Sequence, residues 1–385
     1  MSRRRRMMRW SAAGTATLLV IAAAVGAGWL WRLPSNPQAG TPSPIAADEA
    51  HSTVEALAPP KRPDRPLVAV VGINDATETT DYLMPYGILQ RADVADVSLL
   101  STGPGPVQLY PALRVQPQAT VAEFDAQHPD GADYVIVPAM SRDDDPAVLQ
   151  WISAQASKGA IVIGVCAGAK VVGRAGLLDG RKATTHWYYL DELREHTPTV
   201  EYVPNRRMVV DGGGATTTGI TASMPMMLTL IEAIDGPDTA RSVAEDLGVA
   251  VWDARHDSAA FTFTREFAWT VLTTTAAFWN RDEPILELTP GIDEVSVALV
   301  ADAWSRTYRS TTVTVADDAA VTTRGGLRLL PDRGSVDPPG GHRLPPVTGL
   351  PPAAALDDAL AAIAARYGSD TADVVAMQLE YPDGR

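Results

Sequence analysis

Residues 66–236 alternate between short apolar runs and longer amphipathic segments. Four β-branched runs are typical of strands covered on both faces, at 67–73, 95–101, 132–140 and 160–165. Helical spacing follows in 81–92, where Pro85 is expected near the first turn, and in 145–159, which ends on Gly159. Strands that alternate with helices predict an α/β fold with a doubly wound parallel sheet.

The second half of this domain continues the pattern. The segment 167–180 predicts a helix that Gly180 closes, and "KATTHW" (182–187) predicts a strand or turn. "MVVDGGGATTTG" (208–219) predicts a glycine-rich hairpin, and 222–234 predicts a closing helix. One domain over 66–236 has an ordinary size for this architecture.

The N-terminal segment has the pattern of a membrane anchor. Ser11–Trp31 carries no charge, and five arginines precede it. A run of this length can cross a bilayer, and the positive-inside rule places its N-terminus in the cytoplasm. We therefore expect a cytoplasmic stub and single-pass anchor over 1–32, with the rest of the chain outside the cell membrane. A cleaved signal peptide is the alternative, and it also exports the domain.

The proline-rich segment 33–65 predicts an extended linker between this anchor and the domain. The whole chain has a formal net charge of −14, and the basic stub makes the remainder still more acidic. Such a surface repels phosphate backbones, so direct nucleic-acid binding is not expected. A single cysteine excludes an intramolecular disulfide, and no cluster has zinc-ligand spacing, so we expect no metal or cofactor.

Residues 237–385 predict a C-terminal extension with a faint internal repeat. Helical patterns at 237–247 and 264–280 come first. Three later segments of the extension then resemble segments of the first domain, in the same order. "ILELTPGID" resembles "LVAVVGIND", "GLRLLPD" (326–332) resembles "ALRVQPQ" (112–118), and "ADVVAMQLEYP" (372–382) resembles "ADYVIVP" (132–138). A degenerate duplication predicts a partial α/β unit with parallel strands over 284–385. The seven prolines in 331–352 favour the alternative of an irregular extension.

The only cysteine, Cys166, follows the apolar run 160–165 and precedes the small-residue turn Ala167–Gly168. A strand that turns sharply into a helix presents the residue at the junction above the carboxyl edge of the sheet, where open α/β sheets bind ligands. The helix N-terminus favours a thiolate, and the Ala167 N–H is placed to face a developing oxyanion. The alternative is a buried thiol that only fills the core.

The stretch "GVCAGAKVVGRAGLLDGRKATTHW" resembles the nucleophile region of the ThiJ/PfpI superfamily, which has the class I glutamine amidotransferase-like, flavodoxin-like fold. The similarity is greatest to the branch that includes isonitrile hydratases and the amidase-like sensor domains of AraC-type regulators. This resemblance covers about 66–236. It implies that a carboxylate four residues before a proline approaches the cysteine, which indicates Asp81 here, with Glu78 a poorer candidate.

The resemblance also carries over His186, for which a role in supporting the turn is the alternative to catalysis. Two departures from the family pattern concern the oxyanion site. The family's "PGG" is replaced by Pro138, Ala139 and Met140, so one backbone donor is in doubt. Isonitrile hydratases commonly have Thr where this chain has Ala167.

Two classes of function follow from these features. The first is a cysteine-dependent enzyme that hydrolyses or hydrates a small amide- or isonitrile-like carbon. The second is a non-catalytic sensor of a small molecule or of redox state. A structural module that assembles through its acidic face is a third interpretation. A homodimer is a further expectation, and the partner in the first two classes is a small molecule.

Overall fold

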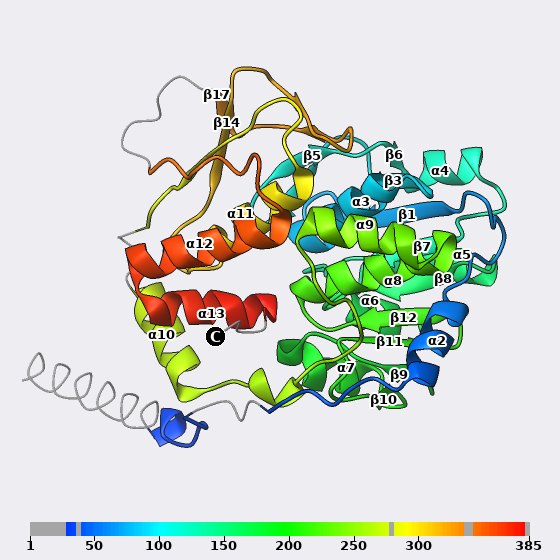
Figure 1. Cartoon of the computed structure of the whole chain (residues 1–385), viewed down its shortest axis with the longest axis horizontal. Coiled ribbons are helices and arrows are strands. Elements are labelled where there is room, and N and C mark those ends of the chain that lie inside the picture. The colour runs from blue at the N-terminus through cyan, green and yellow to red at the C-terminus, as the bar shows by residue number, and fades with distance from the viewer. Residues whose placement is uncertain (1–27, 36–39, 277–280, 335–341, 382–385) are drawn as a thin grey trace, which may run out of the picture.

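The computed structural model describes residues 28–35, 40–276, 281–334 and 342–381. The main sheet has seven strands in the order β11-β12-β8-β7-β1-β3-β6 (Figure 1). These strands are β1 (Leu67–Gly72), β3 (Asp96–Ser101), β6 (Ala119–Thr120), β7 (Tyr134–Val137), β8 (Ile161–Gly164), β11 (Met208–Asp211) and β12 (Gly214–Thr217). All neighbours are parallel except the β11–β12 hairpin. The predicted doubly wound parallel sheet and the predicted hairpin are confirmed.

Alternate residues of each central strand point to opposite faces of this sheet. Val68 and Val70 belong to one hydrophobic cluster, while Ala69 and Val71 belong to another. The first cluster is covered by α3 (Thr79–Ala92), α8 (Ser223–Asp235) and α9 (Pro237–Leu247). The second is covered by α4 (Val121–Gln127), α5 (Pro146–Ser157) and α6 (Gly168–Arg174). Burial on both faces explains why these strands are continuously apolar.

Two helix boundaries differ from the prediction. Helix α3 begins at Thr79 because the Glu78 side chain caps it by accepting the Asp81 N–H, so Pro85 lies in the helix interior and not near the first turn. Helix α6 ends at Arg174 instead of Gly180. Gly176, at a φ of 76°, ends it early, and the Leu177 N–H donates to the Val172 carbonyl.

The C-terminal extension contains a second, smaller α/β unit. Strands β13 (Ile285–Glu287), β14 (Val313–Ala316) and β17 (Arg333–Gly334) are parallel, and α11 (Glu294–Ser305) connects the first two. Parallel strands are what a duplication predicts, although common ancestry itself stays a prediction. "ADVVAMQLEYP" was expected as a strand, but it forms most of helix α13 (Ser369–Leu379), so this part of the prediction is wrong. Its apolar side chains are buried at helical spacing against α12 (Pro352–Tyr367).

Smaller elements complete the fold. A five-stranded sheet joins the two units in the order β15-β16-β5-β4-β2. Its strands are β2 (Thr77–Glu78), β4 (Val107–Tyr110), β5 (Arg114–Gln116), β15 (Val321–Thr322) and β16 (Arg328–Leu329). A two-stranded sheet pairs β9 (Lys182–Ala183) with β10 (Glu201–Tyr202), near α7 (Leu190–His196). The helical patterns after residue 236 are confirmed in α9 and in α10 (Arg265–Ala276), while residues 277–280 lie outside the described part.

The proline-rich segment is not extended throughout, because it contains helix α2 (Ala47–Ala56). This helix packs against α8 and β11. Leu57, directly after it, is fully buried, and its carbonyl accepts the Tyr134 hydroxyl at 2.6 Å. The segment therefore covers part of the domain as well as leading to it.

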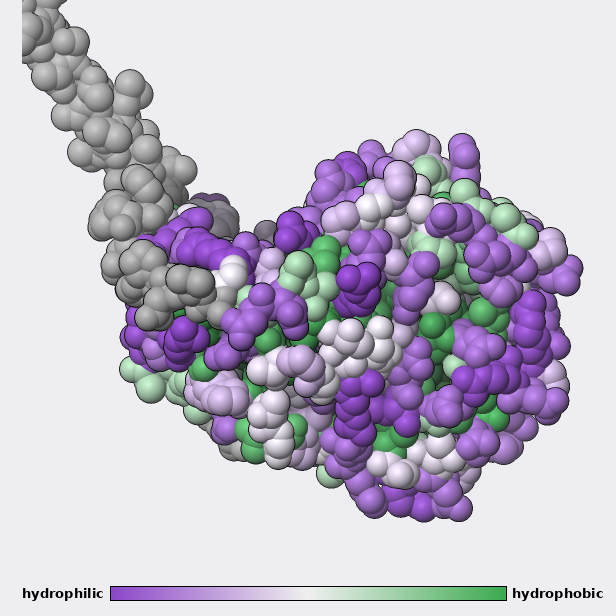
Figure 2. Space-filling model, turned by 90° about the horizontal axis from the view of Figure 1, so that it is seen from above, coloured by the Kyte–Doolittle hydropathy of each residue, from purple (hydrophilic) through white to green (hydrophobic). Residues whose placement is uncertain are grey.

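Within the described residues, every helix is too short or too polar to span a bilayer. Most of the expected anchor, 11–31, lies outside the described residues. Figure 2 shows that hydrophilic residues cover much of the visible face, with hydrophobic residues in small scattered groups. Such a surface is ordinary for a folded domain.

Helices α3 and α11 approach each other closely at Gly87. A Cβ at this position would lie 2.7 Å from Cγ2 of Val295 and 2.8 Å from Cγ of Glu294. The two helices belong to one continuous core that includes Tyr82 and Trp304. The extension therefore buries its apolar face directly against the first domain.

We predict that Gly87→Ala destabilises the chain by about 1–3 kcal/mol, although alanine favours helix, because the new methyl group overpacks this contact. Val295→Ala makes room for that methyl group, so the double variant should lose less stability than the sum of the two single variants. Urea unfolding of the full chain measures all four free energies. Strict additivity would show that the two helices are not tightly packed at this point.

Candidate functional site

Cys166 lies at a sharp turn between β8 and α6. Its φ is +56°, in the left-handed region that a non-glycine residue rarely adopts. The Cys166 N–H donates to Oγ1 of Thr217 at 3.0 Å, and the Thr185 hydroxyl donates to the Cys166 carbonyl at 3.1 Å. Gly168 allows the close approach, because a Cβ there would lie 2.0 Å from the Val137 carbonyl oxygen. The surrounding structure thus maintains the strained geometry of an elbow.

The thiol of Cys166 is 4% exposed and is held in its protonated form. Burial raises the pKa of this thiol well above its usual value, and the charges of Asp81, Glu78 and Glu380 raise it further. The backbone N–H of Ala167 acts in the opposite direction and lowers the pKa. The sequence predicted a thiolate, because a helix N-terminus lowers the pKa of a thiol. In the structure, the effect of burial on the pKa is larger than the effect of this seven-residue helix.

Asp81 is fully buried in the first turn of α3, near the elbow. Its Oδ2 accepts the Ala139 N–H at 3.1 Å, whereas Oδ1 has no hydrogen-bond partner among the described residues. Neither oxygen makes a direct hydrogen bond to Cys166, and the expected approach of this carboxyl to the sulfur, directly or through one water, stays a prediction. Burial and the charge of Glu78 raise the pKa of Asp81 well above its usual value. This carboxyl can consequently hold a proton close to the thiol.

The three backbone positions expected to face an oxyanion are in different situations. The Ala139 N–H is occupied by Asp81. Met140 is buried and lies opposite Thr77 in an isolated antiparallel β-bridge. The hydrogen bonds of this bridge are made by the Ala139 carbonyl and the Ser141 N–H, and not by the Met140 N–H. The Ala167 N–H lies against the sulfur. The Ala167 N–H is thus close to the sulfur, while the Ala139 N–H is committed to Asp81, and an oxyanion role for either stays a prediction.

His186 is buried, and both of its ring nitrogens are engaged away from Cys166. Nδ1 accepts the Tyr188 N–H at 3.2 Å, and Nε2 lies 2.9 Å from the Gln378 carbonyl. The ring is therefore the neutral tautomer with its proton on Nε2. Burial lowers the pKa of His186 to about 4. These contacts support the turn and the end of α13, and a catalytic role for His186 stays an untested prediction.

Arg306, at the end of α11, is a site residue that sequence reasoning missed. Its Nη2 donates to Oε1 of Glu78 at 2.7 Å, and its Nε donates to Oδ2 of Asp302 at 2.7 Å. Burial raises the pKa of Asp302 to about 7. No local motif marks Arg306, because only the packing of α11 on α3 brings it to Glu78.

Residues at the end of α13 cover the elbow from the other side. The Trp187 N–H donates to Oε1 of Glu380 at 2.6 Å, and the Trp187 indole N–H donates to the Met377 carbonyl at 2.9 Å. The Thr221 hydroxyl donates to the Glu380 carbonyl at 2.8 Å. Trp187, at the end of the segment 184–187, thus holds the end of the C-terminal helix in place, and the elbow is covered. In the part of the chain that the structure describes, no group of His, Cys, Asp or Glu side chains is arranged to hold a metal ion.

The doubly wound sheet and the strained cysteine define an α/β domain of the glutamine amidotransferase-like class. Comparison with known proteins identifies it more closely. The model of the DJ-1/PfpI family matches residues 68–233. Isonitrile hydratase from Pseudomonas putida is 35% identical over 175 residues, which are 44% of this chain and 73% of that enzyme. The chain belongs to the DJ-1/PfpI family.

Other relatives are similar over about half of this chain or less. The HTH-type transcriptional regulator CdhR from Pseudomonas aeruginosa is 39% identical over 100 residues, 26% of this chain and 30% of the regulator. A DJ-1 superfamily protein from Salmonella typhimurium, solved as a mutant, has 24% identity and a TM-score of 0.43, covering 48% of this chain and all of its own. An AraC family transcriptional regulator from Pseudomonas putida has 20% identity and a TM-score of 0.42, over 46% and 97% of the two chains. The family model ends before the C-terminal extension.

We predict that iodoacetamide alkylates Cys166 in the folded chain with a midpoint at higher pH than in the urea-unfolded chain, because burial and nearby carboxylates disfavour the thiolate. Glu380→Gln should lower this midpoint, since it removes one of the charges. Mass spectrometry of the single cysteine gives the rate at each pH. A midpoint at or below that of the unfolded thiol would contradict the prediction.

Proposed function

We propose that the domain performs cysteine-dependent addition to a small, neutral, polarised carbon such as that of an isonitrile. The observation that carries this proposal is the buried carboxyl of Asp81, whose Oδ1 has no partner among the described residues and which lies close enough to the strained cysteine to affect the pKa of its thiol. A neutral substrate suits a site in which thiol and carboxyl are both protonated, because the reaction needs a proton as well as a nucleophile.

The reaction balances with these two residues and water. Asp81 donates its proton to the isonitrile carbon while Cys166 forms a carbon–sulfur bond and passes the thiol proton to Asp81. The product is a thioimidate. Water then adds to the same carbon, the carbon–sulfur bond breaks, and a formamide leaves with the thiol and the carboxylic acid restored. The Ala167 N–H lies where it stabilises negative charge during the second step.

Access to Cys166 requires movement of its cover. The end of α13 and the Arg306 ion pairs close the elbow, and the thiol is 4% exposed. The proposal therefore includes displacement of this C-terminal cover when substrate enters. Such gating is common where water must be excluded from a reactive centre.

A second candidate is a sensor that binds a small molecule without turnover. Three observations favour it, namely the raised pKa of the Cys166 thiol, the loss of the Ala139 N–H to Asp81, and the closed elbow. The similarity to a transcriptional regulator is compatible with this function. In that case Cys166 is a structural or oxidisable residue.

Turnover separates the two candidates. We predict that the full chain converts cyclohexyl isocyanide to the formamide, that Cys166→Ser removes the activity, and that Asp81→Asn lowers it about 100-fold. Asp75→Asn, at an exposed carboxylate paired with Arg142, is the matched control and should leave the rate unchanged. NMR detects the product. Binding of the isocyanide without product would refute the enzyme and support the sensor.

We further propose that residues 11–31 anchor the domain on the outer side of the cell membrane. The uncharged run and the arginines before it support this topology. In a Cys166→Ala background, Ser43→Cys in intact cells should react with a membrane-impermeant maleimide, and Ser2→Cys should react only after lysis. Protection of Ser43→Cys would contradict the topology.

A further inference from the structure

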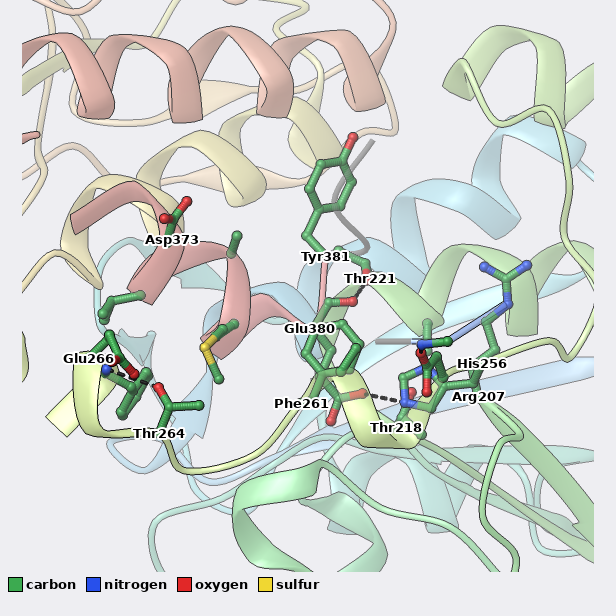
Figure 3. A pocket seen from close by; sticks show the side chains of 18 of the residues that line it. Arg207, Thr218, Thr221, His256, Phe261, Thr264, Glu266, Asp373, Glu380 and Tyr381 are labelled. Atoms are coloured by element: carbon green, nitrogen blue, oxygen red, sulfur yellow. Dashed lines mark hydrogen bonds and ion pairs between the residues drawn. The ribbon is translucent and has the colours of Figure 1, made fainter. Parts of the chain in front are cut away.

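A cavity of about 640 Å³ lies beside the elbow, between α10, α13 and the chain around His256 (Figure 3). Its volume is within the range of small-molecule sites in proteins. Thr218, His256, Phe261, Phe267, Met377 and Glu380 are among its lining residues. Cys166 does not line it, so this cavity is distinct from the elbow.

The wall of the cavity contains a buried carboxylate with one unused oxygen. Glu380 is 3% exposed, and its Oε1 accepts the Trp187 N–H at 2.6 Å. Its Oε2 has no hydrogen-bond partner of good geometry among the described residues, and Nε2 of His256 lies 3.6 Å from it. Burial raises the pKa of Glu380 to about 7, although the Gly219 and Trp187 N–H groups and the Thr218 side chain act in the opposite direction, so the carboxyl is mostly ionised at pH 8. Glu380, His256 and Phe261 are drawn close together in Figure 3. A buried acceptor without a donor is costly, and a bound donor relieves that cost.

The neighbouring basic groups do not neutralise this carboxylate. Burial lowers the pKa of His256 to about 4, so the ring is neutral, and it stacks on Phe261 at a centroid distance of 5.3 Å. Arg207 and Arg255 also line the cavity, but both pair with Asp253, at 3.8 Å and 2.7 Å. Among the residues that the structure describes, no cationic side chain therefore neutralises Oε2.

The other lining residues select the kind of cation. Asp257, Glu266, Asp370 and Asp373 also line the cavity and disfavour an anionic ligand. Phe261, Phe267 and Trp269 offer apolar surface and aromatic faces, which attract cations. We propose that the cavity binds a protonated primary amine with an apolar or aromatic body, whose ammonium group donates to Oε2 of Glu380. This site is additional to the cysteine elbow and does not depend on the reaction proposed for it.

Isothermal titration of the full chain at pH 8 with 2-phenylethylamine tests the proposal. The amine should bind, and its neutral isostere 2-phenylethanol should bind at least 10-fold more weakly, because it lacks the positive charge. Phenylacetate should not bind. Equal affinity for the amine and the alcohol, or no binding of the amine, would overturn the proposal.

Two variants locate the site. Glu380→Gln keeps the shape of the side chain and removes its charge, so affinity for the amine should fall at least 10-fold. Glu245→Gln, an exposed residue on α9 away from the cavity, is the matched control and should bind normally. Ala260→Trp fills the cavity without changing the carboxylate and should also abolish binding. Full affinity in either cavity variant would refute the site.

Cys166→Ala distinguishes this site from the proposed enzyme. The variant should bind the amine with unchanged affinity, even though it has no thiol. A loss of binding in Cys166→Ala would show that the amine occupies the elbow, and would overturn the assignment to the cavity.

Discussion

The ion pairs of Arg306, whose side chain is only 18% exposed, are the interactions on which the two halves of the molecule depend. Glu78, Asp81 and Asp302 are all buried within the same region, and burying ionised carboxyls without a cation is prohibitively costly. Arg306 pairs with Glu78 and Asp302, and raised pKa values let Asp302 and Asp81 hold protons. Of the first domain's two carboxyls in this region, Glu78 therefore relies on a positive charge that the extension supplies, whereas Asp81 can hold a proton instead.

The contacts between the two units follow a rough internal symmetry. Helix α3 packs on α11, and each follows the first strand of its unit. Strand β5 pairs with β16, and these strands lie in the segments 112–118 and 326–332 that match in sequence. The smaller unit has too few elements to cover its own sheet, so it completes its core on the larger one. Helix α11 covers α3, so a homodimer of this chain could not form through that side of α3.

Local sequence patterns were sufficient to predict the sheet and the elbow. A continuous apolar run indicates a strand that is buried on both faces, and a cysteine followed by small residues indicates a tight turn. They were insufficient for α13, where "ADVVAMQL" contains β-branched residues that fit a strand as well as a helix, and only packing on α12 decides. The raised pKa of the Cys166 thiol could not be predicted either, because it comes mainly from burial and only then from carboxylates, one of which, Glu380, lies more than 200 residues away in sequence. Arg306 left no local signal at all, because its partner Glu78 is in the other unit.

Glu380 connects the elbow and the cavity. Its charge raises the pKa of the Cys166 thiol, and the same carboxyl lines the cavity with an unpartnered oxygen. A cation bound at Oε2 offsets this charge, so it makes the thiolate less costly and Cys166 more nucleophilic. Thermodynamic linkage requires the reverse as well, so ionisation of the thiol strengthens binding of the cation by the same factor. If the proposed cation binds there, the extension that covers the elbow would also change the reactivity of the cysteine through this one carboxyl.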